Sequence, residues 1–109
     1  MIVAGRELVF QQGFLDALHG LESWTNQSNT RSGRALVKRV ADFVSDIVAP
    51  FPFSFPAFRL PTAPARTLRR AVLDRRYAVI CEVHETELLL VLVYSTHQNA
   101  DLLELPASG

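Results

Sequence analysis

TLRRAVLDRRYAVICEVHETELLLVLVYST, residues 67–96, carries the main information about the architecture of this chain. Its apolar side chains alternate with polar ones or form continuous runs, and both patterns are typical of β-strands. Only DRR and a tight turn near Glu85 and Thr86 separate the runs, so we predict three strands in an antiparallel meander. The run from Leu88 to Tyr94 is apolar on both faces. This predicts a central strand that is covered, at least in part, on both sides.

The segment before the meander predicts a helical hairpin. A short strand candidate at residues 7–11 is followed by apolar residues at helical spacing between Phe14 and Trp24. A second amphipathic run covers residues 36–48. The polar connection at residues 25–30 is short, which favours antiparallel packing of the two helices.

Pro50 is expected to end the second helix, and the proline-rich residues 50–64 are expected to be extended. The predicted fold is therefore α+β with the order β-α-α-β-β-β, a helical hairpin packed on a curved antiparallel sheet. A chain of 109 residues, 49% of them apolar, can close one core but not two. We expect a single domain over residues 1–109.

Composition also bears on localisation and cofactors. No stretch of eighteen uncharged apolar residues occurs, and Arg6 and Glu7 interrupt the apolar N-terminus. A cytoplasmic protein without a membrane partner is expected. Cys81 is the only cysteine and falls within an apolar run, which indicates a core position. No residues have metal-ligand spacing, so neither a metal nor a cofactor is expected.

Charge is distributed unevenly along the second half of the chain. Residues 59–76 contain six arginines and one acid, whereas residues 77–109 contain acids and no lysine or arginine. The two sets could pair across the sheet, or the arginines could form an anion-binding patch. Arg69 and Arg70 lie on opposite faces of one strand, and spacing does not tell which faces a target. The candidate target-binding residues are Arg66, Arg69, Arg70, Arg75, Arg76 and Gln98.

Two further features have two interpretations each. The polar cluster at residues 95–99, which ends the last strand, is either a turn or a working surface. Five apolar residues outside the main runs either close the core or form a docking surface for an extended apolar peptide. They are Phe51, Phe53, Leu102, Leu103 and Leu105.

The element order and several motifs resemble the RelE/ParE superfamily, the toxin half of bacterial type II toxin-antitoxin pairs. The motifs are W-T-N-Q at the first helix end, the proline-bearing segment, L-R-R-A-V-L, Y-A-V-I-C-E-V and V-Y-S-T-H-Q-N. The resemblance runs from about Leu8 to Leu103. Many members end the last strand with a pattern like D-T-R-Q-N-P or H-x-R-Q. Ser95, His97 and Ala100 depart from it.

The resemblance implies three functions. ParE-like members inhibit DNA gyrase by binding it, and this branch is favoured here because the residue set usual in the nucleases is incomplete. RelE-like members cut messenger RNA on the ribosome, with His97, Arg69 and Arg70 as the catalytic candidates. A degenerate member would bind its antitoxin without poisoning anything. Whether the protein is an enzyme stays open.

The resemblance also implies a partner. A small cognate antitoxin is expected to cover the apolar docking candidates, in complex with a toxin homodimer or within a heterotetramer.

Overall fold

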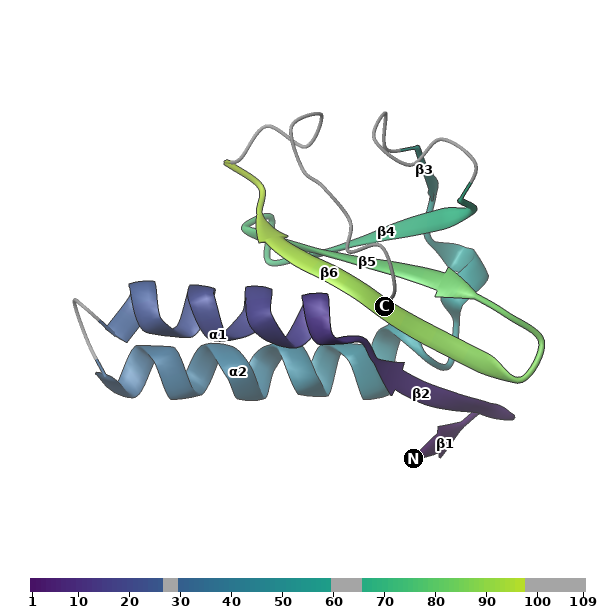
Figure 1. The fold of residues 1–109 in the computed structure, drawn as a ribbon, viewed down its shortest axis with the longest axis horizontal. Coiled ribbons are helices and arrows are strands. Elements are labelled where there is room, and N and C mark those ends of the chain that lie inside the picture. Colours follow the sequence, from purple (N-terminus) through teal and green to yellow (C-terminus); the bar gives the residue numbers. More distant parts are fainter. Residues whose placement is uncertain (27–29, 60–65, 98–109) are drawn as a thin grey trace.

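The computed structural model describes residues 1–26, 30–59 and 66–97 (Figure 1). Its elements follow in chain order. They are β1 (Ile2–Val3), β2 (Arg6–Phe10), α1 (Gln12–Asn26), α2 (Thr30–Phe43), a π-helical turn (Val44–Val48), a 3-10 turn (Pro52–Ser54), β3 (Ala57–Phe58), β4 (Leu68–Leu73), β5 (Tyr77–Val83) and β6 (Glu87–Ser95). The predicted α+β class is confirmed, because two helices pack on one sheet.

The sheet is mixed, so the prediction of a purely antiparallel sheet is wrong. Its strand order is β1-β2-β6-β5-β4-β3. The meander of β4, β5 and β6 is antiparallel as predicted, but β2 pairs parallel with β6, with Leu8 opposite Leu88. A short hairpin forces antiparallel pairing only between strands that it joins. The helical hairpin and three strands separate β2 from β6 along the chain, so β2 is free to run parallel.

The second helix differs from its predicted form at its C-terminal end. Leu36, Val40, Val44 and Val48 of the predicted apolar face are buried, whereas Ile47 of the same face is 49% exposed. From Val44 onward, however, the chain forms a π-helical turn, in which the Ala49 N–H donates to the Val44 carbonyl at 2.8 Å. With this wider turn, Val48 stays buried at the end of the helix, just before Pro50.

The main core lies between the helical hairpin and one face of the sheet. Phe14 of α1 is 1% exposed and contacts Phe10 of β2 with 5.6 Å between ring centroids. From the sheet, Leu88 and Leu90 of β6 are fully buried in the same cluster. The apolar side chains of the helices and of the strands thus form a single buried layer.

Part of the other face of the sheet is also buried. Its cluster comprises Leu68, Ala78, Ile80, Val91, Leu92 and Tyr94. The predicted coverage of β6 on both sides is therefore confirmed. A β-bulge accompanies it, because Ile80 lies opposite Leu92 while Cys81 lies opposite Leu90. Val91 is the extra residue of the bulge.

Cys81 is expected to resist thiol reagents in the folded protein. Its side chain is fully buried, and burial raises the pKa of the thiol to about 11, against a smaller lowering by Arg69. Because the thiolate is the reactive form, a disulfide reagent at about pH 8 should react with Cys81 only as fast as the protein unfolds. The measurement is reagent uptake with and without denaturing urea. Equal rates in both would contradict the buried position.

Candidate functional site

The turn between β4 and β5 is tied to the end of β6. Asp74 and Arg75 have positive φ angles of 53° and 61°, and the Arg76 N–H donates to the Leu73 carbonyl at 3.0 Å. These are features of a type I′ turn, here within a three-residue connection, because Leu73 pairs with Tyr77. Thr96 donates its hydroxyl to the Arg75 carbonyl at 2.9 Å and its N–H to the Arg76 carbonyl at 2.8 Å. The turn and the residues after β6 therefore hold each other in place.

This turn is also bound to the helical hairpin. Asp74 forms an ion pair with Arg39 of α2. Asp74, the acid of the turn, is therefore paired with Arg39, while the neighbouring Arg75 and Arg76 side chains are exposed. Among the residues that the structure describes, neither of these two arginines forms an ion pair. Two cations are thus presented at one end of the sheet.

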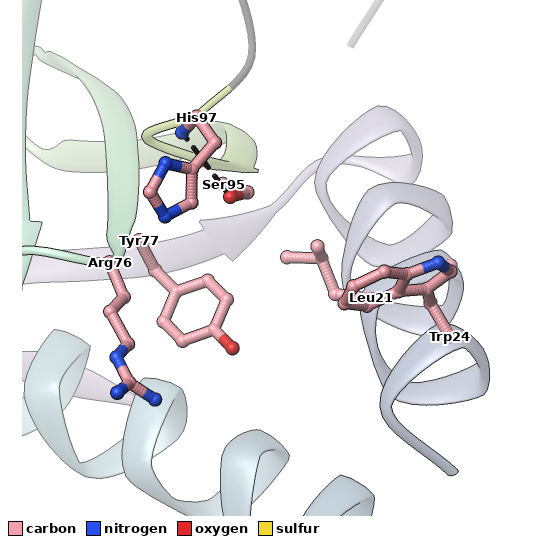
Figure 2. Close-up of a pocket in the computed structure, with 7 residues that line it drawn as sticks. Leu21, Trp24, Arg76, Tyr77, Ser95 and His97 are labelled. Atoms are coloured by element: carbon pink, nitrogen blue, oxygen red, sulfur yellow. Dashed lines mark hydrogen bonds between the residues drawn. The ribbon is translucent and has the colours of Figure 1, made fainter. Parts of the chain in front are cut away.

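A cavity of about 740 Å³ lies between α1 and this end of the sheet (Figure 2). The described residues that line it are Gly20, Leu21, Trp24, Arg76, Tyr77, Ser95 and His97. Figure 2 shows Leu21 and Trp24 of α1 facing Tyr77, Arg76 and His97 across the open space. The α1 wall is apolar, and the opposite wall carries the Arg76 guanidinium and the His97 imidazole beside the Tyr77 ring.

His97 reaches the cavity because β5 and β6 pair antiparallel. Tyr77, at the start of β5, lies opposite Ser95, at the end of β6. The His97 N–H donates to the Ser95 hydroxyl at 3.3 Å, which folds the chain back toward the cavity. His97 and Arg76 therefore line the same cavity. The polar residues after β6 are more than a connecting turn.

Arg70 does not line this cavity and has a structural contact instead. Its Nε donates to the Tyr94 hydroxyl at 2.9 Å, and its guanidinium lies 5.9 Å from the centre of the Tyr94 ring. Tyr94 is 2% exposed. Arg70 therefore satisfies a buried hydroxyl on the sheet face away from the helices.

Arg70→Ala is expected to lower the free energy of unfolding by about 1–3 kcal/mol, because the Tyr94 hydroxyl would stay buried without its donor. Tyr94→Phe removes that hydroxyl. The loss in the Arg70→Ala/Tyr94→Phe double variant should therefore be smaller than the sum of the two single losses. Urea denaturation of the four proteins measures the coupling. Additive losses would show that the hydrogen bond contributes nothing.

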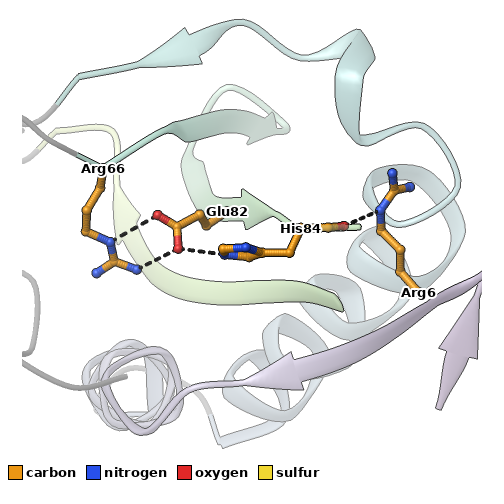
Figure 3. Close-up of polar contacts among 4 residues, drawn as sticks. All are labelled: Arg6, Arg66, Glu82 and His84. Carbon is orange, nitrogen blue, oxygen red and sulfur yellow. Dashed lines mark hydrogen bonds and ion pairs between the residues drawn. The ribbon is translucent and has the colours of Figure 1, made fainter. Parts of the chain in front are cut away.

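Arg66 also has an intramolecular partner (Figure 3). Its Nε lies 3.2 Å and its Nη2 3.5 Å from the carboxylate oxygens of Glu82. His84 contacts the same carboxylate at 2.9 Å, and the His84 carbonyl accepts a hydrogen bond from Arg6 at 2.8 Å. For Arg66, pairing across the sheet is the correct interpretation of the charge pattern.

The Glu82 cluster is expected to make stability depend on acid pH. Burial by itself raises the pKa of Glu82, but hydrogen bonds from Arg66 and then His84 bring it below its ordinary value of 4.5. A lowered pKa in the folded state stabilises the protein above the ordinary pKa, and this contribution is lost as the pH falls through the folded value. The free energy of unfolding, measured by urea denaturation across this range, should fall less steeply for Glu82→Gln. Parallel curves would contradict the prediction.

Arg69 points to the helix side of the sheet, opposite to Arg70. Its Nη1 donates to the Phe55 carbonyl at 2.7 Å, and its guanidinium lies 5.0 Å from the centre of the Phe53 ring. Arg6 approaches the same ring at 5.3 Å. The structure therefore does not bring the arginines of β4 into one patch.

The remaining candidates are distributed as follows. Phe51 and Phe53 are 66% and 61% exposed, as a docking surface requires. Four others lie outside the described residues: Gln98, Leu102, Leu103 and Leu105.

Sequence reasoning missed the α1 wall of the cavity. Leu21 and Trp24 were expected within the buried stripe of the first helix, but Trp24 is 73% exposed. The hairpin of α1 and α2 extends past the sheet (Figure 1), so the end of the stripe has no strand to pack on. A tryptophan close to a helix end was the only available signal.

No family model matches the chain, and no curated protein matches it. Within residues 1–26, 30–59 and 66–97, no group of three or more His, Cys, Asp or Glu side chains could hold a metal ion. No helix in the same ranges is long and apolar enough to span a membrane.

Proposed function

We propose that this protein is a cytoplasmic ParE-like toxin of a type II toxin-antitoxin pair, which inhibits growth by binding DNA gyrase. The observation that carries the choice of binding over cleavage is the distribution of the arginines. Arg66, Arg69 and Arg70 are engaged within the protein, whereas Arg75 and Arg76 are exposed together at one turn. Exposed arginines on a turn whose backbone is held by hydrogen bonds suit the recognition of a large anionic or acidic surface.

Induction of the protein in bacterial cells tests the proposal. Gyrase inhibition predicts a change in plasmid supercoiling and an SOS response before translation falls. The matched control is the same strain with a vector that carries no insert. Rapid transcript cleavage with intact supercoiling would reject the gyrase target.

A RelE-like ribonuclease is the alternative, and one observation favours it. His97 and Arg76 line one cavity, so a base or acid and a cation are available together. The variant His97→Ala separates the two functions. A binding toxin keeps its effect on growth in this variant, whereas a nuclease that uses His97 loses it. Unchanged growth on strong induction of the unmodified protein would instead support a degenerate member.

The partner in this proposal is a small antitoxin that covers the exposed phenylalanines Phe51 and Phe53. Co-expression with a candidate antitoxin should restore growth and yield a complex, whose stoichiometry would distinguish a homodimer-based assembly from a heterotetramer. Phe51→Ser/Phe53→Ser should weaken that complex. The matched control is Ile47→Ser, which changes an exposed apolar residue on the π-helical turn. Equal weakening by both would exclude a specific role for the phenylalanines.

A further inference from the structure

We propose that the cavity between α1 and the β4–β5 turn binds a small anion that carries a flat aromatic ring, of the nucleoside monophosphate class. The inference goes beyond the proposed function and does not depend on it. The cavity volume of about 740 Å³ falls within the range of small-ligand sites in proteins. Its two walls differ in chemistry, and each wall matches one half of such a ligand.

The wall formed by the sheet is suited to the phosphate. Arg76 and His97 both line it, and none of the described residues that line the cavity carries a carboxylate. The one acid of the adjacent turn, Asp74, is engaged by Arg39. An arginine fork matches the geometry of phosphate oxygens. Because Thr96 hydrogen-bonds the carbonyls of Arg75 and Arg76, the backbone that carries the cation is held before a ligand arrives.

The wall formed by α1 is suited to the ring. Leu21 and Trp24 face Tyr77 across the cavity (Figure 2). Trp24 is 73% exposed, so its indole leaves a large apolar surface without protein cover. Any of the nucleobases can stack on an aromatic side chain, because every base has a π-face. A ligand ring placed here would cover both Trp24 and Tyr77.

Gly20 offers a way to obstruct the cavity without disturbing the fold. It lies on α1 and lines the cavity, and a Cβ atom added there would meet no atom within 4 Å. A larger side chain at this position would therefore project into open space. Replacing a glycine inside a helix by leucine also favours the helix. Gly20→Leu should thus obstruct part of the cavity and leave the protein folded.

Trp24 is the only tryptophan of the chain, so its fluorescence reports on the cavity directly. The protein is titrated with adenosine monophosphate, adenosine and inorganic phosphate. The monophosphate should change the emission saturably, and adenosine or phosphate alone should bind at least about tenfold more weakly. Arg76→Ala should weaken the binding of the monophosphate by about tenfold or more. Arg34→Ala, which removes an exposed arginine of α2 that does not line the cavity, should leave it unchanged.

Three results would overturn the inference. They are no saturable change with the monophosphate, equal binding of phosphate and monophosphate, and unaltered binding in folded Gly20→Leu. A 5′-phosphorylated RNA trinucleotide identifies the source of the ligand. If the trinucleotide binds more tightly than the monophosphate, the ligand of the site is the 5′ end of an RNA strand. If it binds equally or more weakly, the ligand is a free nucleotide. Growth inhibition without nucleotide binding rejects this inference alone, and nucleotide binding without growth inhibition rejects the proposed toxin alone.

Discussion

Phe14→Ala will lower the free energy of unfolding by about 3–5 kcal/mol. Phe14 is 1% exposed and lies in the layer between the helical hairpin and the sheet. Its removal leaves a cavity that the surrounding side chains fill only in part, and it deletes the ring contact with Phe10 at 5.6 Å. Small domains have a total stability of about 5–15 kcal/mol, so this variant should be close to unfolding. Urea denaturation followed by circular dichroism gives the value.

The adjacent residue supplies the matched control. Leu15 belongs to the same turn of α1 but is 43% exposed. Leu15→Ala should lower the free energy of unfolding by less than about 1 kcal/mol, because its side chain loses little buried area. Comparable losses in the two variants would show that the helix does not pack on the sheet through Phe14.

Arg75→Glu/Arg76→Glu is expected to abolish growth inhibition if the protein is a binding toxin. The two side chains are exposed at the tip of the β4–β5 turn, away from the two cores. The substitution changes the local charge by four units and turns an attraction to an acidic target into a repulsion. Colony counts on inducing medium should rise by about a hundredfold or more, since like-charge contacts at an interface cost several kcal/mol.

A second double charge reversal, on α2, controls for the change in net charge. Arg34 and Lys38 are exposed there, and Lys38 pairs only with Asp42 of the same helix among the described residues. Arg34→Glu/Lys38→Glu should remain toxic. Circular dichroism must show that both variants are folded. Full toxicity of a folded Arg75→Glu/Arg76→Glu protein would remove the turn from the proposed target surface.

The part of the fold that the sequence predicts is the part set by local periodicity. Residues 67–96 form the three strands of the meander, and Leu36, Val40, Val44 and Val48 of the predicted apolar face are buried as expected. The parallel partner of β6 could not be predicted in this way. The pairing of Leu8 with Leu88 depends on the path of the chain through the helical hairpin and the strands that follow it. No local sequence pattern predicts that path.

The site divides in the same way. Arg76 and His97 were both candidates, but only the pairing of Tyr77 with Ser95 brings them to one cavity. Spacing placed Arg69 and Arg70 on opposite faces without saying which face is which. The contact of Arg69 with the Phe55 carbonyl settles this, and it comes from a proline-rich segment whose path has no periodic signal. Helical spacing gave no sign that Trp24 lies beyond the end of the sheet.

The parallel pairing of β2 with β6 has a consequence for biosynthesis. Leu8 and Leu88 are roughly 80 residues apart, and contacts of such long sequence separation close late because loop entropy opposes them. On the ribosome, β2 emerges early and can pair with β1, but its other edge has no partner until β6 has left the exit tunnel. The nascent polypeptide therefore carries an unpaired strand edge through most of its synthesis, and early chaperone contact should fall on Arg6–Phe10.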